Sequence, residues 1–418
     1  MNRRARPLLD RSFDIYCRVV DNFGDAGICW RLARQLAVEH GCAVRLYVDR
    51  RATLERLLDR APAPTVDVAP GAAPAPGAVA ILDWPADEAA EAAPVDVVIA
   101  AFGCRLPAAV RRQLRPASPG APPAPLWINY EYLSAEDWVE RAHGLPSIMP
   151  EDAAVEYFYF PGFTPRTGGL LRERDLCAER ERFQSGTQRA DWLAGRGVAP
   201  RAGEPVISLF CYDDPWLAQW FDALAREPRP RSVLVPEGVA EAAIRAHFGR
   251  LPQVGRSLRQ GGLTLTRIGW LSQFDYDRLL WASNLNFVRG EDSWIRAHWA
   301  GRPFVWQPYP QAEAVHLGKL QAFLGRLLAQ ARPDQAQVVA RMMSAWSTGV
   351  DVAAAWPPFA RALWPQTGNA SAVPAAPAHA PESALARLYL DFAAALAAQP
   401  DLATKLLEFA CGHRDRLK

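Results

Sequence analysis

Short apolar runs alternate with helical patterns along most of this chain, and they do so in two separate blocks. In the first block FDIYCRVV at 13–20 precedes a helical pattern near 27–40, and AVRLYVD at 43–49 precedes another, ATLERLLDR. The second block begins near Glu204 with PVISLFCY at 205–212. Strands that alternate with helices in this way form a parallel sheet with right-handed crossovers. The sequence therefore predicts an α/β protein with two such domains in tandem.

Composition places the domain borders. We expect an N-terminal Rossmann-like domain over 1–190, a C-terminal Rossmann-like domain over 191–365, a linker over 366–383, and helices over 384–418 that pack across both domains. The stretch PQTGNASAVPAAPAHAPES has the alanine and proline content of a linker and leads into two apolar helical patterns. Ligands of open parallel sheets bind at the carboxyl ends of the strands, so the two domains should face a shared cleft.

Charge and hydropathy exclude several classes of protein. With 47 basic and 45 acidic side chains the net charge is only +2, which argues against a nucleic-acid partner. No run of about 18 apolar residues is present, so no membrane span and no membrane partner are expected. The first residues, MNRRARPLLDRSFD, lack the apolar stretch of a secretory signal. The seven cysteines stand singly without CxxC pairs, as buried reduced thiols do, and the protein is predicted to be cytoplasmic.

The first candidate site follows the first predicted strand, in VVDNFGDAGICWRLARQL. Asp21 and Asp25 lie four residues apart where strand becomes helix, which is the sheet edge that faces a substrate cleft. Ordinary turn chemistry could also explain them, with Asn22 and Gly24 forming the bend and Asp25 capping the helix. Two carboxylates and a glycine together favour a site, and the absence of GxGxxG excludes a dinucleotide fingerprint.

The second candidate site follows the strand LNFVR at 285–289 and precedes a helical pattern. Gly290 would let the backbone approach a ligand closely, and the helix N-terminus would offer N–H groups and a positive dipole end to a diphosphate. Arg289 would add a fixed positive charge. The alternative is that Asp292 or Ser293 only caps the helix, which would still be compatible with phosphate binding at this corner.

Four segments in order between residues 14 and 311 resemble the EarP family, the bacterial protein-arginine rhamnosyltransferases of translation elongation factor P. They are DIYCRVVDNFGDAGICWRLARQL, SLFCYDD, QFDYDRLLWASNLNFVRGEDS and WAGRPFVWQPYPQ. The chain departs from the family pattern in its Ala/Pro-rich stretches at 61–94, 115–125 and 365–383, which leave the motif residues untouched. The resemblance thus spans most of the chain.

The resemblance implies a GT-B fold, with a protein acceptor on the N-terminal domain and dTDP-β-L-rhamnose on the C-terminal domain. It implies an enzyme, an inverting glycosyltransferase that moves L-rhamnose to an arginine guanidinium of elongation factor P, without a cofactor or a metal. The family's catalytic acids match Asp21, Asp25 and Glu291. Its donor-binding residues match Phe210, Tyr212, Gln273, Arg289, Asp292 and Ser293, to which the corner itself adds Gly290.

We interpret Asp25 as the more favoured base and Asp21 as the residue that orients the guanidinium, although the sequence does not separate these roles. Asp275-Tyr276-Asp277 has the spacing of a metal-binding DxD, but its place at a helix start favours a structural role. The competing functions are a GT-B transferase or epimerase that acts on a small molecule or another nucleotide sugar, and a non-catalytic nucleotide-sensing or translation-factor-binding protein of the same fold.

Overall fold

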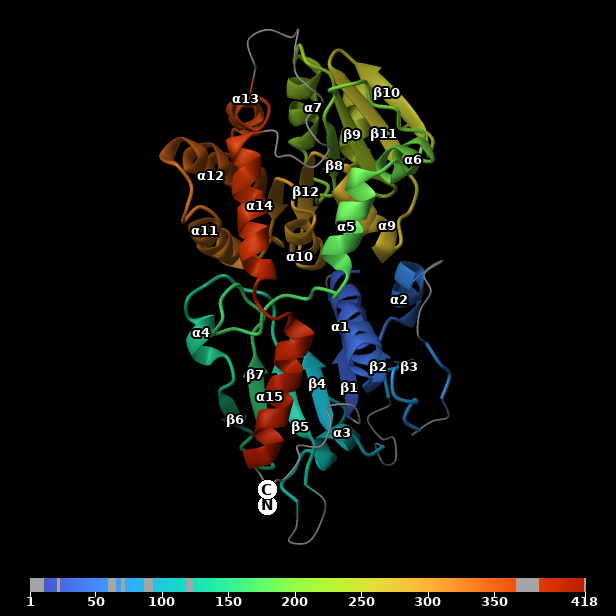
Figure 1. Cartoon of the computed structure of the whole chain (residues 1–418), viewed down its shortest axis with the longest axis vertical. Coiled ribbons are helices and arrows are strands. Elements are labelled where there is room, and N and C mark those ends of the chain that lie inside the picture. The colour runs from blue at the N-terminus through green and yellow to red at the C-terminus, as the bar shows by residue number, and fades with distance from the viewer. Residues whose placement is uncertain are drawn as a thin grey trace. The chain divides into compact units, whose positions relative to one another are not determined.

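The computed structural model describes residues 11–20, 23–58, 65–68, 72–85, 93–117, 123–365 and 383–416. The chain forms two compact units, unit 1 from Met1–Arg174 with Gln399–Lys418, and unit 2 from Asp175–Ala398 (Figure 1). The chain thus leaves unit 1 after Arg174, not at the border predicted near residue 190. The predicted linker over 366–383 lies outside the described residues except for its last residue.

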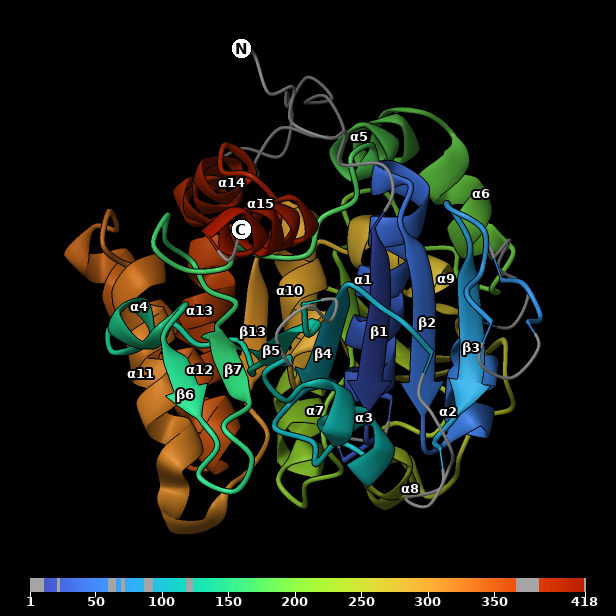
Figure 2. The ribbon, with the colours of Figure 1, turned by 90° about the horizontal axis from the view of Figure 1, so that it is seen from below.

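Unit 1 is built on a seven-stranded sheet of order β3-β2-β1-β4-β5-β7-β6, whose strands lie side by side in Figure 2. All neighbouring strands are parallel except β6 and β7. Chain order reverses between β1 and β4, and such switch points are where doubly wound sheets bind ligands. The strands are β1 Ser12–Cys17, β2 Ala43–Val48, β3 Val79–Asp83, β4 Val97–Ala101, β5 Leu126–Tyr130, β6 Pro146–Ile148 and β7 Val155–Tyr159.

Helices cover both faces of this sheet. The long helix α1 packs on β2 through an apolar stripe that includes Ile28, Leu32 and Leu36, and it ends at the left-handed Gly41. On the opposite face α3 contributes Val110 to a buried cluster with Tyr16 of β1. The helices of unit 1 are α1 Gly24–His40, α2 Arg51–Leu58, α3 Ala108–Gln113, α4 Val139–Ala142 and α15 Leu402–Arg416.

Unit 2 contains a six-stranded sheet of order β10-β11-β9-β8-β12-β13. Its neighbouring strands are parallel except β10 and β11, and chain order reverses between β8 and β12. The carboxyl ends of β8 and β12 are therefore the expected ligand edge of this unit. The strands are β8 Val206–Leu209, β9 Arg231–Pro236, β10 Arg256–Gln260, β11 Leu263–Ile268, β12 Leu285–Arg289 and β13 Phe304–Gln307.

The helices of unit 2 include two whose first turns are capped by serine side chains, Ser272 before α9 and Ser383 before α14. The α-helices of unit 2 are α5 Leu176–Ser185, α6 Gln188–Ala194, α7 Leu217–Ala225, α8 Glu241–Phe248, α9 Gln273–Ala282, α10 Asp292–Trp299, α11 Val315–Leu327, α12 Pro333–Thr348, α13 Val352–Leu363 and α14 Ala384–Ala397. The two C-terminal helices were predicted to pack across both domains. In the structure α14 packs on α10 and α13 of unit 2, and α15 packs on α1 and β5 of unit 1.

Each unit is a doubly wound α/β domain of the Rossmann type, and two of these in one chain make the GT-B class. The predicted fold class is therefore confirmed. The helices α5 and α6 belong to unit 2 although the sequence border assigned them to the N-terminal domain, because they pack on α9 rather than on the first sheet.

A buried ion pair lies inside the sheet of unit 1. Asp14 of β1 and Arg45 of β2 are register partners, each about 2% exposed, and their side chains meet at Nε–Oδ1 2.6 Å and Nη2–Oδ2 2.9 Å. Arg45 Nη2 also donates to the carbonyls of Ala93 and Pro94. Burial raises the pKa of Asp14 to about 6, although the guanidinium of Arg45 acts in the opposite direction. The pair therefore depends on both partners being present.

We expect Arg45→Met to lower the free energy of unfolding by about 3–5 kcal/mol at pH 8, because it leaves a buried carboxylate without its counter-charge. Loss of the guanidinium raises the pKa of Asp14 further, whereas an unfolded aspartate titrates near about 3.9. The native variant then binds a proton that the unfolded chain does not, so its stability should rise as pH falls from 8 to 5. Urea unfolding at both pH values measures this.

The matched control is the double variant Asp14→Leu/Arg45→Met, which removes both charges and should recover most of the lost stability. Equal losses in the single and double variants would show that the ion pair is not the cause.

Candidate active site

The segment after β8 holds an arginine of β12 between two aromatic rings. The strand ends at Leu209, earlier than predicted, so Phe210 and Tyr212 lie beyond it rather than inside it. The Cζ atom of Arg289 lies 4.6 Å from the ring centroid of each, and its Nη1 donates to the carbonyl of Cys211 at 3.0 Å. Stacking of a guanidinium on two rings is attractive and orients the cation.

The corner between β12 and α10 turns at Gly290, whose φ of 60° lies in the left-handed region that a side chain disfavours. The end of β13 binds both of its peptide groups. Gly290 N donates to Gln307 O at 3.1 Å, and Trp306 Nε1 donates to Gly290 O at 2.7 Å. Trp306 in turn stacks on Trp294 of α10, with ring centroids 3.6 Å apart. The corner is therefore held on both sides by the neighbouring strand.

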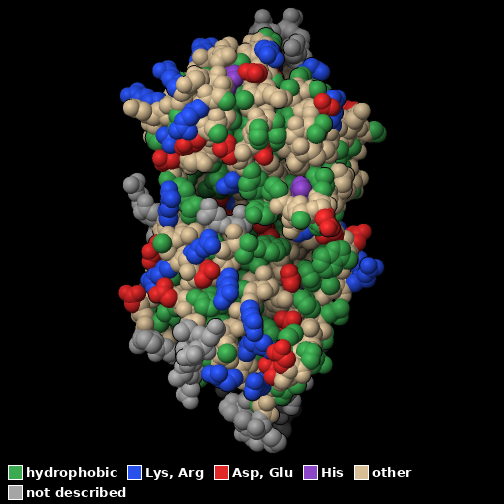
Figure 3. Space-filling view, turned by 180° about the vertical axis from the view of Figure 1, so that it is seen from behind, with side chains coloured by type: hydrophobic (Ala, Val, Ile, Leu, Met, Phe, Trp, Pro, Cys, Tyr) green, Lys and Arg blue, Asp and Glu red, His purple; other side chains and the backbone are tan. Residues whose placement is uncertain are grey.

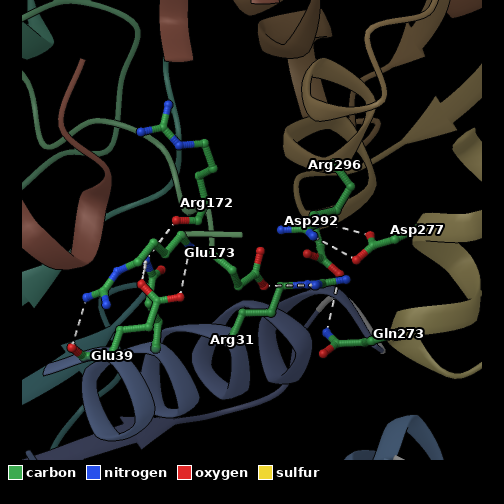
Figure 4. A network of polar contacts seen from close by, with 10 residues as sticks. Arg31, Glu39, Arg172, Glu173, Gln273, Asp277, Asp292 and Arg296 are labelled. Atoms are coloured by element: carbon green, nitrogen blue, oxygen red, sulfur yellow. Dashed lines mark hydrogen bonds and ion pairs between the residues drawn. The ribbon is translucent and has the colours of Figure 1, made fainter. Parts of the chain in front are cut away.

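Glu291 is the N-cap residue of α10, and no side-chain hydrogen bond caps this helix. The alternative that Asp292 or Ser293 serves as the cap is therefore not what the structure shows. The hydroxyl of Ser293 accepts from Arg289 N at 3.0 Å and donates to Arg289 O, which closes the turn around the arginine. Asp292 in the first turn accepts a hydrogen bond from Gln273 Nε2 at 3.4 Å (Figure 4).

Tyr276 of α9 supports this corner and was not singled out from the sequence as a site residue. Its ring packs edge-on against Phe210, with centroids 5.3 Å apart. Burial raises the pKa of the Tyr276 hydroxyl, which stays neutral, and Ser293 faces it. All seven residues assigned to donor binding thus lie at the end of β12, in the segments that directly follow β8 and β12, or in the first turns of α9 and α10.

In unit 1 Asp25 lies in the first turn of α1 and is only 2% exposed. Its Oδ2 accepts a hydrogen bond from Val20 N at 2.8 Å, so the carboxylate links the first turn of α1 to Val20, three residues after the end of β1. The helix has Phe23 as its N-cap and begins earlier than the predicted start near residue 27, and Asp25 is therefore not the cap. Asp21 lies outside the described residues.

Polar side chains anchor α1 to the segments where the chain passes between the units. Arg31 pairs with Glu173 at 3.3 Å (Figure 4). Gln35 Nε2 donates to Arg172 O at 2.7 Å and to Asp401 Oδ1 at 2.9 Å. Arg31 and Gln35 are buried, at 5% and 2% exposure. Polar residues within the otherwise apolar face of this helix were the available sequence signal for these contacts.

The sequence matches one known protein family over nearly its whole length. The family model described as Elongation-Factor P (EF-P) rhamnosyltransferase EarP matches residues 13–411. The chain belongs to the EarP family.

Two curated relatives named protein-arginine rhamnosyltransferase illustrate the similarity. That of Pseudomonas putida is 44% identical over 400 residues, covering 95% of this chain and 98% of the relative. That of Neisseria meningitidis serogroup B is 37% identical over 317 residues, covering 74% and 77%. A solved structure described as the structural basis for EarP-mediated arginine glycosylation of translation elongation factor EF-P is 32% identical. The match to it has a TM-score of 0.62 and covers 96% of this chain and 98% of the chain of the solved structure. Membership makes this chain a glycosyltransferase of the rhamnosyltransferase kind.

The two acids of the DxD in this EarP-family chain are engaged by arginines. Asp275 lies in the first turn of α9 and pairs with Arg196 and Arg278, each at 3.2 Å. Asp277 forms a bidentate pair with Arg296 of α10 at 2.8 and 2.7 Å, and both side chains are nearly fully buried (Figure 4). Among the described residues no three His, Cys, Asp or Glu side chains are grouped to hold a metal ion. Through these ion pairs both acids of the DxD link elements of unit 2 to one another.

The distribution of charged side chains on the surface is relevant to a nucleic-acid partner, and the apolar content of the helices to a membrane. On the face shown in Figure 3, basic and acidic side chains are interspersed over each unit rather than gathered into one basic patch. No helix of the described ranges combines the length and the apolar character needed to cross a membrane.

We expect Asp277→Asn to lower the free energy of unfolding by about 3–5 kcal/mol, because Arg296 then keeps a buried charge without its partner. Asp275→Asn is the matched control and should lower it by about 1 kcal/mol or less, since its ion pairs are partly exposed. Chemical unfolding of both variants measures the difference. A metal-dependent activity that Asp277→Asn abolishes, with little change in stability, would contradict the structural role.

Proposed function

We propose that this protein is an inverting glycosyltransferase that moves L-rhamnose from dTDP-β-L-rhamnose to an arginine guanidinium of translation elongation factor P. The observation that carries the proposal is the guanidinium of Arg289, clamped between Phe210 and Tyr212 beside the N-terminus of α10. The name of the relatives, one of them 44% identical over nearly the whole chain, supports rhamnose as the sugar and a protein arginine as its acceptor. The family description supports elongation factor P as the acceptor protein. Since the proposed acceptor is a translation factor, we also propose that the enzyme works in the cytoplasm.

The donor is assigned to unit 2. A guanidinium has five N–H donors, and the Cys211 carbonyl takes one of those of Arg289, so others can bind a diphosphate oxygen. The N-terminus of α10 adds the positive end of the helix dipole. Phe210 and Tyr212 would lie near the thymine, and the pair of Gln273 and Asp292 would bind the base or the ribose. Arg289 and the helix would stabilise the leaving dTDP in place of a metal.

The acceptor is assigned to unit 1, where a guanidinium has to be both held and deprotonated. Its pKa exceeds about 12, so a carboxylate must accept the proton as the new bond forms. We assign Asp25 as this base, Asp21 as the residue that pairs with the guanidinium, and Glu291 as a further acid of the site. The hydrogen bond from Val20 N fixes the Asp25 carboxylate.

In the proposed step the guanidinium nitrogen attacks the anomeric carbon from the side opposite dTDP. The C–N bond forms, the C–O bond to the diphosphate breaks with its electron pair, and the nitrogen proton passes to Asp25. Attack from the back inverts the anomeric centre, so the β-linked donor gives an α-linked product.

The test is intact-mass analysis of elongation factor P after incubation with dTDP-β-L-rhamnose and the enzyme. We expect the acceptor to gain one deoxyhexose on an arginine, and Asp25→Asn to slow this transfer by a factor of roughly 10²–10⁴. The amide oxygen of the variant can still accept from Val20 N, so the turn and dTDP binding should persist.

Asp49→Asn is the matched control. Asp49 Oδ1 accepts a hydrogen bond from the adjacent amide, Val19 N, at 3.0 Å, so it makes the same kind of backbone contact without an assigned chemical role. Its variant should transfer rhamnose at nearly the wild-type rate. Near wild-type transfer by Asp25→Asn would show that Asp25 only fixes the turn, and no transfer by the wild-type enzyme would refute the proposed reaction.

A further inference from the structure

One buried glutamine at the end of β13 contacts both segments that form the donor corner. Gln307 is 3% exposed and is the last residue of the strand. Its Oε1 accepts from Tyr212 N at 3.3 Å and its Nε2 donates to Asp214 Oδ2 at 2.7 Å, while its backbone oxygen accepts from Gly290 N at 3.1 Å. The partners require this orientation of the amide, since a backbone N–H must donate and a carboxylate must accept.

We propose that Gln307 is a positioning residue for the nucleotide donor, an inference that rests on the proposed function. It ties the loop after β8, which carries the rings that clamp Arg289, to the glycine that forms the turn before α10. The partners of its three polar contacts, Tyr212, Asp214 and Gly290, are all 17 or more positions away in sequence, so no local turn supplies the same restraint. The loop after β8 is also joined to β12 by the hydrogen bond from Phe210 N to Phe287 O and by Arg289, the residue assigned to the diphosphate, but the amide of Gln307 binds the loop farther along, at Tyr212 and Asp214.

Neighbouring contacts strengthen this connection. Tyr309, two residues after Gln307, packs its ring edge-on against Tyr212 with centroids 5.8 Å apart. Asp214 also makes two backbone hydrogen bonds. Its N–H donates to Tyr212 O at 3.1 Å, and its carbonyl accepts from Leu217 N of α7. The Gln307 amide therefore reaches a loop whose own hydrogen bonds already hold Tyr212 and Asp214 together.

The hydrogen-bond directions allow a reciprocal test. Gln307→Glu keeps an acceptor for Tyr212 N but places a second carboxylate against Asp214, so the loop should be pushed away from β13. We expect the Kd for dTDP to rise about tenfold or more, as for loss of a hydrogen bond to a charged group. Asp214→Asn alone should bind dTDP within about threefold of wild type, because its amide oxygen can still accept from Gln307.

Combining the two changes should restore binding. In Gln307→Glu/Asp214→Asn the new carboxylate accepts from both Tyr212 N and the new amide, so every hydrogen bond is made with one donor and acceptor exchanged. We expect the Kd for dTDP to return to within about threefold of wild type. If Gln307 only stabilised the fold, dTDP affinity would not recover in the double variant when its free energy of unfolding equals that of Gln307→Glu.

Gln184→Glu is the matched control for a buried glutamine in the same unit. Gln184 is 6% exposed and donates to Trp281 O at 3.0 Å, so its variant should lose stability while the folded protein binds dTDP normally. If Gln307→Glu does not fold, Gln307→Met takes its place, since it removes both side-chain hydrogen bonds without adding a charge and should lose affinity equally.

Calorimetric titration with dTDP measures the Kd of the wild-type protein and of all these variants. Wild-type protein that binds dTDP, together with a Gln307→Glu variant that binds it equally well, would overturn this inference alone. Failure of the double variant to recover affinity would also overturn it. Wild-type protein that does not bind dTDP would overturn the donor assignment and this inference with it.

Discussion

The donor side of this protein depends on how Gly290 is held. A residue with φ of 60° can leave β12 and start α10 two residues later, and the end of β13 binds its N–H and its carbonyl at once. That short turn brings Arg289 and the first turn of α10 to the same sheet edge as the loop after β8. A larger residue at 290 would be strained in this conformation, and the corner would open. The clamp on Arg289 follows from this geometry.

At the switch point of the sheet in unit 1, a side chain rather than a neighbouring strand holds the start of the helix. The Asp25 carboxylate binds the amide of Val20 and so links α1 to the segment after β1, and Arg31 and Gln35 anchor α1 further along its length. A carboxylate that both shapes a turn and takes a proton is sensitive to substitution in two ways. This is why an amide, which keeps the hydrogen bond and removes the charge, is the informative replacement for Asp25.

Elements with a strong local signal could be predicted from the sequence. The runs LNFVR and ALARLYLDFAAALA coincide with β12 and α14, because continuous apolar content or helical spacing defines them without help from the rest of the chain. β10 was missed because RSLRQ is mostly charged or polar and becomes a strand only by pairing with β11. The Gly261-Gly262 turn between these strands was the signal that could have revealed them.

The border between the units and the role of Gln307 depend on contacts that are distant in sequence. The helices α5 and α6 follow directly on the first domain along the chain, and only their packing against α9 assigns them to unit 2. Likewise the partners of Gln307 at 212 and 290 cannot be read from WQPYPQ. The predicted donor residues gather at one edge because parallel strands end there, which the strand and helix alternation already implied.

The most direct test of the account is calorimetric titration of dTDP into wild-type protein, Arg289→Ala and Arg278→Ala. Arg278 is an exposed arginine of the same unit whose ion pair is with Asp275, so its loss should leave affinity unchanged. A charge-assisted contact to phosphate contributes about 1.5–3 kcal/mol, so Arg289→Ala should weaken dTDP binding about tenfold or more. Equal affinity of Arg289→Ala and wild type would contradict the assignment of the diphosphate to the corner between β12 and α10.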